Sequence, residues 1–202
     1  MRELVMSMFV SLDGVMQAPG GPEEDLAGGF AHGGWTVPYW DEAMDAFMGE
    51  FMTGPFDLVL GRKTYDTFAA YWPHSTEGGA EELNAATKYV ASRGRPTLGW
   101  DRSVLLEGDV AEGVAALKRE EGPELQVHGS GDLLQTLIRH GLVDRFRLLV
   151  FPLVLGSGKR LFTEATGPAA LRLLSSTVSS TGVVMSTYEP AGEVATGSFP
   201  LE

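Results

Sequence analysis

Short apolar segments of strand length alternate with segments of helical period along most of this chain. Strands are predicted at residues 4–10, 57–60, 87–92, 102–108, 124–128 and 144–155, the last of them broken by Pro152. Helices are predicted around 40–52 with Pro38 near the first turn, after Gly61, over 109–122, and from Leu133 onward. Such alternation is typical of an α/β fold of three layers, in which helices cover both faces of a mostly parallel central sheet.

Two further predicted strands, at 170–177 and 182–189, lie close together near the end of the sequence. Only a short polar stretch separates them, which favours an antiparallel hairpin at one edge of the sheet. No repeat or linker divides the 202 residues, and 44% of them are hydrophobic, enough to build a substantial core. We therefore expect a single domain over residues 1–202.

The charge balance argues against several classes of partner. The chain carries 15 Lys and Arg against 27 Asp and Glu, a net charge of −12, so nucleic acids and anionic membranes would meet repulsion. It has no cysteine, which excludes disulfides, thiolate metal sites and cysteine nucleophiles. Because the start of the sequence lacks a secretory signal pattern and no apolar run reaches membrane-spanning length, we expect a cytoplasmic protein.

Common catalytic and phosphate-binding motifs are absent. The segment at 155–162 resembles a P-loop, but no glycine stands five residues before Gly158, and Arg160 replaces the Ser or Thr that would hold magnesium. The sequence contains no GxSxG motif of serine hydrolases. The four histidines, His32, His74, His128 and His140, show no zinc-site spacing, so no metal site is predicted.

Three turns at predicted strand ends carry residues suited to anions. They are Gly61-Arg62-Lys63-Thr64, Ser92-Arg93 and Gly129-Ser130-Gly131. In a parallel sheet these turns meet at one edge, where the first N–H groups of the following helices favour negative charge. Taken singly, the first is equally well explained as an ordinary turn with two solvated cations, the second is better explained as a solvated loop end, and the third is a weak signal. The third turn also lacks the last glycine of GxGxxG, because Leu134 occupies that position.

The order of these segments resembles a known family. A first strand ending in SLDG is followed by LVLGRKTYDTF, YVASR and VHGSGDLLQTLIRHGLVDRFRLLVFPLVLGSGKRLF, and together they resemble the dihydrofolate-reductase-like fold. Within that fold the sequence is most similar to the riboflavin-biosynthesis reductase branch, the RibD C-terminal domain and its stand-alone relatives, over about residues 2–190. The resemblance implies an NADPH-dependent reductase that acts on a small heterocycle, such as a ribosylaminopyrimidine phosphate or a pteridine.

The resemblance also implies a role for each turn. Gly61, Arg62, Lys63 and Thr64 would contact the adenosine side and the phosphates of NADPH, and Ser92 and Arg93 would meet its 2′-phosphate. The pyrophosphate would lie on Gly129, Ser130, Gly131, Asp132 and Leu133. The glycine-rich loop at 17–34 would form a lid, with Gly14 and Met16 approaching the nicotinamide through their backbone groups.

Reduction also requires a proton, and three acids are candidate donors. Asp41 and Asp45 are predicted on the first long helix, where the folate-reducing members of the fold carry an acid, although a helix-start acid and a solvated acid explain them equally well. Asp13 would lie at the mouth of the site, or would simply form a turn. His128 stands where many riboflavin reductases are expected to have Glu, and Lys159 and Arg160 could bind a substrate phosphate.

Two alternative functions remain open from the sequence. One is true dihydrofolate reduction, which needs an acid facing the pterin and a basic anchor for the glutamate tail. The other is a nucleotide-binding module without turnover. The family resemblance further implies a homodimer, for which the apolar run at 146–155 and the C-terminal hairpin could supply an edge.

Overall fold

The computed structural model describes residues 1–199 and contains one eight-stranded mixed sheet. The strands are β1 (Leu4–Ser11), β2 (Phe56–Gly61), β3 (Lys88–Ala91), β4 (Ser103–Leu106), β5 (Glu124–His128), β6 (Arg145–Phe151), β7 (Leu171–Val178) and β8 (Val184–Pro190), in the order β4-β3-β2-β5-β1-β6-β8-β7. All neighbours from β4 to β6 are parallel, and β8 is antiparallel to both β6 and β7. This arrangement confirms the predicted α/β fold with a C-terminal hairpin.

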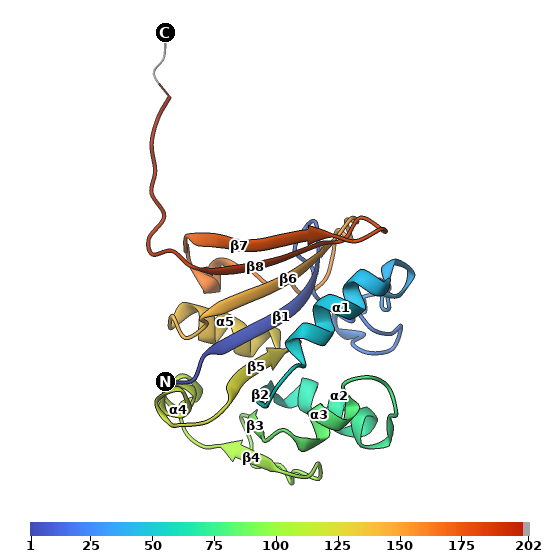
Figure 1. The fold of residues 1–202 in the computed structure, drawn as a ribbon, viewed down its shortest axis with the longest axis vertical. Coiled ribbons are helices and arrows are strands. Elements are labelled where there is room, and N and C mark those ends of the chain that lie inside the picture. The colour runs from blue at the N-terminus through green and yellow to red at the C-terminus, as the bar shows by residue number, and fades with distance from the viewer. Residues whose placement is uncertain (200–202) are drawn as a thin grey trace.

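Helices pack on both faces of the sheet (Figure 1). They are α1 (Glu42–Phe51), α2 (Arg62–Tyr71), α3 (Ala80–Ala85), α4 (Val110–Arg119) and α5 (Gly131–Arg139), with short 3-10 turns at Ala27–Gly29, Val37–Tyr39, Trp72–His74 and Glu164–Thr166. The alternating side chains of β1 send Leu4, Met6 and Met8 toward Val114 of α4 and Leu134 of α5. On the other face, α1 packs over β6 and β8, and α2 and α3 pack over β2 and β3.

Helix α1 begins later than the sequence predicts. Pro38 lies in the 3-10 turn Val37–Tyr39, Trp40 follows in extended backbone, and Asp41 is the residue that caps α1. The side chain of Asp41 accepts a hydrogen bond from the backbone N–H of Met44 at 3.1 Å. The sequence offers two possible starts for this helix, one at Pro38 and one at Asp41. The helix starts after Asp41, because the side-chain oxygen of Asp41 accepts a hydrogen bond from a free N–H group of the first turn.

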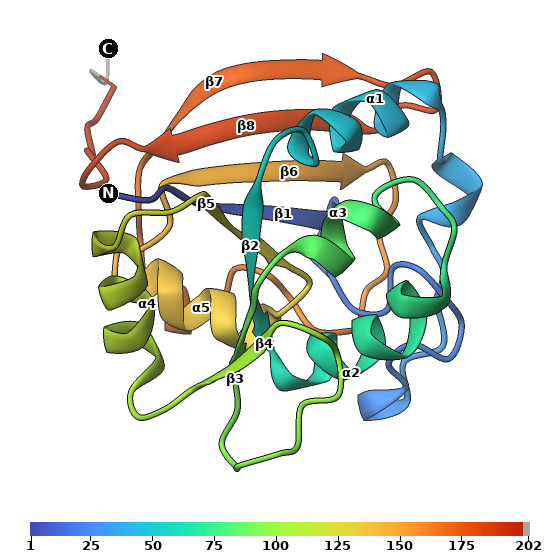
Figure 2. The same ribbon diagram turned by 60° about the horizontal axis from the view of Figure 1, so that its bottom comes forward.

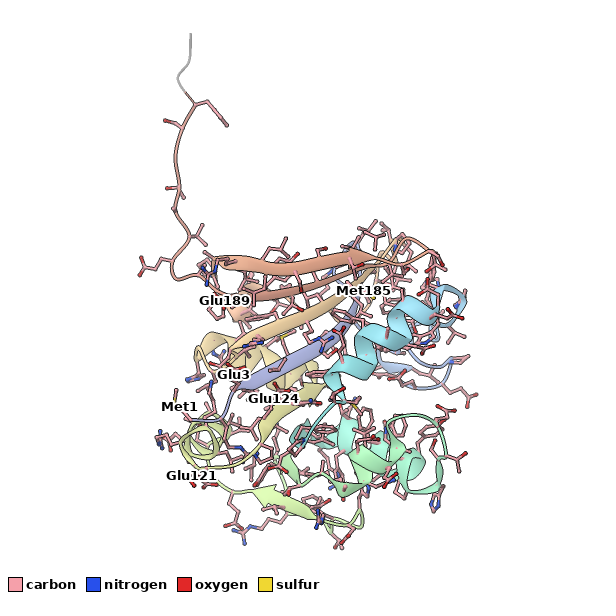
Figure 3. All side chains as sticks on the ribbon, in the orientation of Figure 1. Met1, Glu3, Glu121, Glu124, Met185 and Glu189 are labelled. Atoms are coloured by element: carbon pink, nitrogen blue, oxygen red, sulfur yellow. The ribbon has the colours of Figure 1, made fainter. Side chains whose placement is uncertain are left out.

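The two halves of one sheet face leave a gap between their helices. Figure 2 shows α1 over the β6–β8 side, with α2 and α3 beside β2 and β3. Met185 of β8 is buried beneath α1, whereas Glu3 and Glu124 lie at the amino ends of β1 and β5 (Figure 3). The carboxyl ends of the same strands therefore face the opposite edge, where the loops gather.

Candidate functional site

A single large cleft of about 2400 Å³ runs along the carboxyl edge of the sheet and continues between α1 and α2. Most residues predicted for the site line it: Met16, Asp45, Gly61, Arg62, Lys63, Thr64, Ser92, Arg93, Gly129, Ser130, Gly131, Asp132, Leu133, Lys159 and Arg160. Asp13, Gly14 and Asp41 do not line it. The fold thus brings the three anion-friendly turns to one surface, although they are far apart in the sequence.

Glycines allow these turns to approach one another closely. Gly129 has a left-handed φ of 67°, and a Cβ there would lie 3.2 Å from Cγ2 of Thr64. A Cβ on Gly131 would lie 2.8 Å from Sδ of Met16. The turn after β5 therefore packs against both the start of α2 and the segment after β1, and a Cβ at these two positions would require the side chains of Thr64 and Met16 to shift.

Two helix N-termini open into the cleft. Helix α2 starts at Arg62 directly after β2, and α5 starts at Gly131 two residues after Gly129. Neither helix has a side-chain cap, so the N–H groups of each first turn are free to bind an anion. This geometry suits a ligand that carries two separated phosphate groups.

The cations of the cleft differ in how far they are already neutralised. Nε of Arg62 lies 2.7 Å from both carboxylate oxygens of Asp66. Lys159 pairs with Asp25, and Arg160 pairs with Asp13 at 3.2 Å. Within residues 1–199, Lys63 and Arg93 form no ion pair. Lys63 and Arg93 are therefore the positive charges most available to a phosphate.

The three candidate proton donors occupy different environments. Asp45 lines the cleft, and its Oδ1 accepts a hydrogen bond from Nε1 of Trp40 at 2.6 Å. Asp41 lies outside the cleft and accepts hydrogen bonds from the hydroxyl and the N–H of Ser180 at 2.7 and 2.8 Å, and these bonds, the hydroxyl first, lower its pKa. Its position suits a structural cap better than a proton donor.

Asp13 fastens the end of β1 to the loop after β6. Its carboxylate accepts hydrogen bonds from Ser11 Oγ at 2.6 Å and from the N–H groups of Leu155 and Gly156 at 3.1 and 3.0 Å. These bonds, that from Ser11 first, lower the pKa of Asp13 to about 2. A carboxyl group with this pKa is ionised at neutral pH and is a poor proton donor.

The predicted lid folds around one buried amide. Gln17 donates from Nε2 to the carbonyls of Asp25 and Ala27, both at 2.9 Å, and accepts from the N–H of Lys159 at 3.0 Å. The backbone carbonyl of Gln17 accepts a hydrogen bond from Nε1 of Trp35 at 2.8 Å. Residues 17–36 are therefore tied by Gln17 to the loop after β6, and residues 23–26 lie along the rim of the cleft.

His128 forms part of the cleft floor. Its ring lies between those of Phe51 and Phe68, with centroid distances of 5.0 and 6.4 Å. Burial, with a smaller contribution from the charge on Arg147, lowers the pKa of His128 to about 4. The imidazole is consequently uncharged at neutral pH.

Sequence reasoning missed the apolar walls of the cleft between α1 and α2. Their residues are Phe9, Trp40, Met48, Met52, Phe68 and Trp72. The helical spacing of Met48, Met52 and Phe68 also fits an ordinary core face, so the sequence offers no signal that separates a core residue from a wall. Only the gap between the helices decides which side chains remain open to a ligand.

Comparison with known proteins agrees with this geometry. The family model described as "RibD C-terminal domain" matches residues 2–185. The uncharacterized protein YyaP of Bacillus subtilis is 27% identical over 192 residues, which cover 93% of this chain and 94% of YyaP. The uncharacterized protein YwjB of the same organism is 29% identical over 173 residues, covering 85% of this chain and 89% of YwjB.

Three solved structures share the fold. A putative riboflavin biosynthesis protein from Shewanella sp. PV-4 has a TM-score of 0.65 at 18% identity, covering 93% of this chain and 98% of that one. A pyrimidine reductase-like protein from Corynebacterium diphtheriae has a TM-score of 0.63 at 13% identity, with coverages of 95% and 93%. Dihydrofolate reductase from Enterococcus faecalis, complexed with NADP(H) and RAB-propyl, has a TM-score of 0.59 at 16% identity, with coverages of 94% and 96%.

The described residues lack two kinds of feature. Among residues 1–199, no helix is long and apolar enough to cross a membrane. In the same part of the chain, no group of three or more His, Cys, Asp or Glu side chains could hold a metal ion.

Proposed function

Because this chain belongs to the RibD C-terminal domain family, we propose that it is an NADPH-dependent reductase that transfers a hydride to a small heterocycle of the pyrimidine or pteridine type. One observation carries the proposal. The uncapped N-termini of α2 and α5 and the unpaired cations Lys63 and Arg93 meet in one cleft of a protein whose net charge is −12. An acidic protein needs such a local positive region to bind a polyphosphate.

The residues of the cleft fit the parts of NADPH in order. The pyrophosphate would rest on the turn at 129–133 and the N-terminus of α5, and the adenosine side would rest on Gly61, Arg62, Lys63 and Thr64. Ser92 and Arg93, which follow β3, would receive the 2′-phosphate. Met16 would lie against the nicotinamide, because its side chain reaches the turn at Gly131. The bound cofactor supplies the hydride.

The proton would come from the wall formed by α1. Hydride addition to a C=N or C=O carbon leaves negative charge on the neighbouring heteroatom, which must be protonated. Asp45 is the candidate donor that lines the cleft, and the hydrogen bond from Trp40 holds its carboxyl group beside the indole of that residue, which also lines the cleft. Water entering from the open side of the cleft would restore the proton.

Dihydrofolate reduction is the second candidate. Two observations favour it. Asp45 lies on α1, which forms one side of the cleft, and the fold is similar to that of a dihydrofolate reductase. A third candidate is a nucleotide-binding protein without turnover. The ion pairs that already hold Arg62, Lys159 and Arg160 are compatible with that reading.

Two measurements test these candidates. Calorimetric titration with NADPH and NADH should give saturable binding with a clear preference for NADPH, and absence of binding would remove the reductase proposal. Oxidation of NADPH should then be followed with dihydrofolate and a panel of pterins, pyrimidines and small carbonyl compounds. Binding of NADPH without oxidation by any of them would favour the non-catalytic module.

We also propose that the protein is a cytoplasmic homodimer. Strand β7 ends the sheet, and Leu173, Leu174 and Val178 on it are 53%, 44% and 62% exposed. An apolar edge strand of this kind is a natural surface for pairing with a second copy. Sedimentation equilibrium should give twice the chain mass, and Leu174→Lys should shift the protein toward the monomer.

A further inference from the structure

The part of the cleft between α1 and α2, here called the helix lobe, is lined largely by apolar side chains. Met48 and Met52 come from α1 and its C-terminal cap, Phe68 and Trp72 come from α2 and its C-terminal cap, and Ser7 and His128 come from β1 and β5. Apolar walls of this kind fit a flat ring.

The charged side chains that line the helix lobe are all negative, and the guanidinium of Arg147, which lies over the rings of Phe47 and Phe51, acts on His128 from outside the lining. Asp45, Glu77 and Glu82 line it, and Glu77 holds the hydroxyl of Tyr71 at 2.6 Å. Every Lys or Arg that lines the cleft within residues 1–199 lies elsewhere, in the segments at 62–63, 93–95 and 159–160. The cations of the cleft are therefore confined to the strand ends, where acidic side chains such as Glu23, Asp25 and Glu107 also lie, whereas the charged side chains that line the helix lobe are acidic alone.

Lys159 and Arg160 lie in the loop after β6. The backbone carbonyl of Arg160 accepts a hydrogen bond from Nε2 of Gln135 on α5 at 3.2 Å, and the backbone carbonyl of Lys159 accepts one from the N–H of Met16 at 2.8 Å. Their charged ends pair with Asp25 and Asp13, so each cation already has an acidic partner outside the helix lobe. They do not supply the helix lobe with positive charge.

Hydrogen bonds fix the form of the His128 ring. Nε2 of Gln126 donates to the carbonyl of Phe51 at 2.6 Å and to Oε1 of Glu124 at 3.0 Å. This orientation turns Oε1 of Gln126 toward Nε2 of His128, at 3.2 Å. Since an amide oxygen only accepts, Nε2 of His128 carries the hydrogen, and in an uncharged imidazole Nδ1 then carries a lone pair.

Nδ1 of His128 is open to the cleft. Among residues 1–199, the one buried side-chain nitrogen or oxygen without a hydrogen-bond partner is Nε of Arg147. No described group donates to Nδ1 of His128, so this atom is accessible rather than buried. The helix lobe therefore presents an acceptor on its floor and acidic acceptors around its rim.

We propose that the helix lobe takes an unphosphorylated flat heterocycle that donates a hydrogen bond from a ring N–H or amino group to Nδ1 of His128. This inference rests on the proposed reductase function and narrows its substrate class. A phosphate on the substrate would bring two negative charges to a lobe that carries three acidic side chains and no cation among the described lining residues. The glutamate tail of dihydrofolate would meet the same repulsion.

A matched pair of probes tests the charge argument. The protein is saturated with NADP⁺ and titrated calorimetrically with 5-amino-6-ribosylaminouracil and, separately, with the same compound carrying a 5′-phosphate. We expect the unphosphorylated probe to bind at least about tenfold more tightly, the size of effect that close like charges produce near a protein surface. Equal or tighter binding of the phosphorylated probe would overturn the inference.

Two variants of neighbouring residues sharpen the test. Glu82→Lys places a cation in the helix lobe. It should reduce the ratio of the affinities for the two probes about fivefold or more. Glu81→Lys makes the same change one residue earlier on α3, at an exposed position that does not line the cleft, and should leave the difference unchanged. Equal effects of the two variants would contradict a specific role of the lobe.

A third variant tests the hydrogen bond to the ring. His128→Phe should lower the affinity for the unphosphorylated probe about tenfold, while the affinity for NADP⁺ is retained. Unchanged binding of the probe would overturn the role of Nδ1. The titration with NADP⁺ separates the two levels of the argument, since failure of that titration counts against the reductase itself, whereas failure with the probes alone counts only against the substrate class.

Discussion

The backbone N–H of Gly61 donates a hydrogen bond to the side-chain hydroxyl of Ser130, with a nitrogen-to-oxygen distance of 2.9 Å. Gly61 ends β2 and Ser130 precedes α5, so this bond joins the two turns whose helices point their N-termini into the cleft. This hydroxyl group therefore helps to set the spacing of the two N-termini that we propose to bind the phosphates of NADPH.

Replacement of Ser130 by Ala tests that bond. The N–H of Gly61 would lose its partner, which typically costs about 1–2 kcal/mol of unfolding free energy. We also expect several-fold weaker NADPH binding, since α2 and α5 would no longer be held in register. Urea denaturation and calorimetric titration measure the two effects. Ser175→Ala, at an exposed position on β7, is the control, and equal results for both variants would show that the bond is unimportant.

Two glycines with nearly the same backbone form a matched pair. Gly129 and Gly141 have φ angles of 67° and 63°. A Cβ at Gly129 would contact Thr64, whereas a Cβ at Gly141 would lie in open space. Alanine should cost about 1–2 kcal/mol at either site because of the left-handed backbone. Gly129→Ala should in addition displace Thr64 and weaken NADPH binding, whereas Gly141→Ala should not. Comparable NADPH affinities of the two variants would argue against close packing of this turn on α2.

Arg62 should distinguish NADPH from NADH. Its guanidinium keeps further N–H groups after pairing with Asp66 through Nε, and Arg62 lines the cleft at the turn that we propose for the adenosine side of NADPH. Arg62→Ala should lower the affinity for NADPH by about ten to a hundredfold, because a charge-assisted hydrogen bond is lost. The affinity for NADH should change much less. Arg62→Lys keeps the charge and should lose less. Equal losses for both nucleotides would exclude a role in reading the 2′-phosphate.

Two aspartates four positions apart should behave differently. Asp45→Asn should lower turnover about a hundredfold or more, as expected for a proton donor, with little change in NADPH affinity. Asp41→Ala should lower the melting temperature, because it removes the cap of α1 and the bonds to Ser180, and it should leave turnover of the folded enzyme nearly intact. The reverse pattern would assign the proton to Asp41.

The sequence predicted those parts of the molecule that local chemistry determines. The turns at Gly61 and Gly129 follow buried strands and precede amphipathic helices, and the topology rule for parallel sheets then places them together. Asp109 caps α4 through the N–H of Glu112, as its spacing predicts. In each case the deciding contacts lie within a few residues in the chain.

Long-range contacts decided the rest. The role of Asp13 depends on N–H groups more than 140 positions away, at Leu155 and Gly156, and that of Asp41 depends partly on Ser180. Lys88 was predicted only as part of a strand, yet it is fully buried, with Nζ 4.2 Å from the ring of Trp100, and burial lowers its pKa to about 8. A sequence shows the type of these residues but not the partners that fix their state.

The imidazole of His128, which is half-buried and lines the cleft, should make stability depend on pH. Its folded-state pKa is about 4, below the value near 6.5 of an unfolded histidine, because burial disfavours the charged ring. Between these values the unfolded chain binds a proton that the folded protein does not, so stability falls as the pH decreases through this window and the contribution levels off below it. From about pH 7 to about pH 5 the loss in the free energy of unfolding should be about 2 kcal/mol.

His128→Gln tests this prediction, because it removes the titrating group while the other three histidines remain. Urea denaturation of the two proteins at these two pH values then isolates the contribution of His128. The same pH dependence in both proteins would mean that His128 is protonated as readily in the folded state as in the unfolded chain, and its proposed role as an uncharged acceptor would then fail.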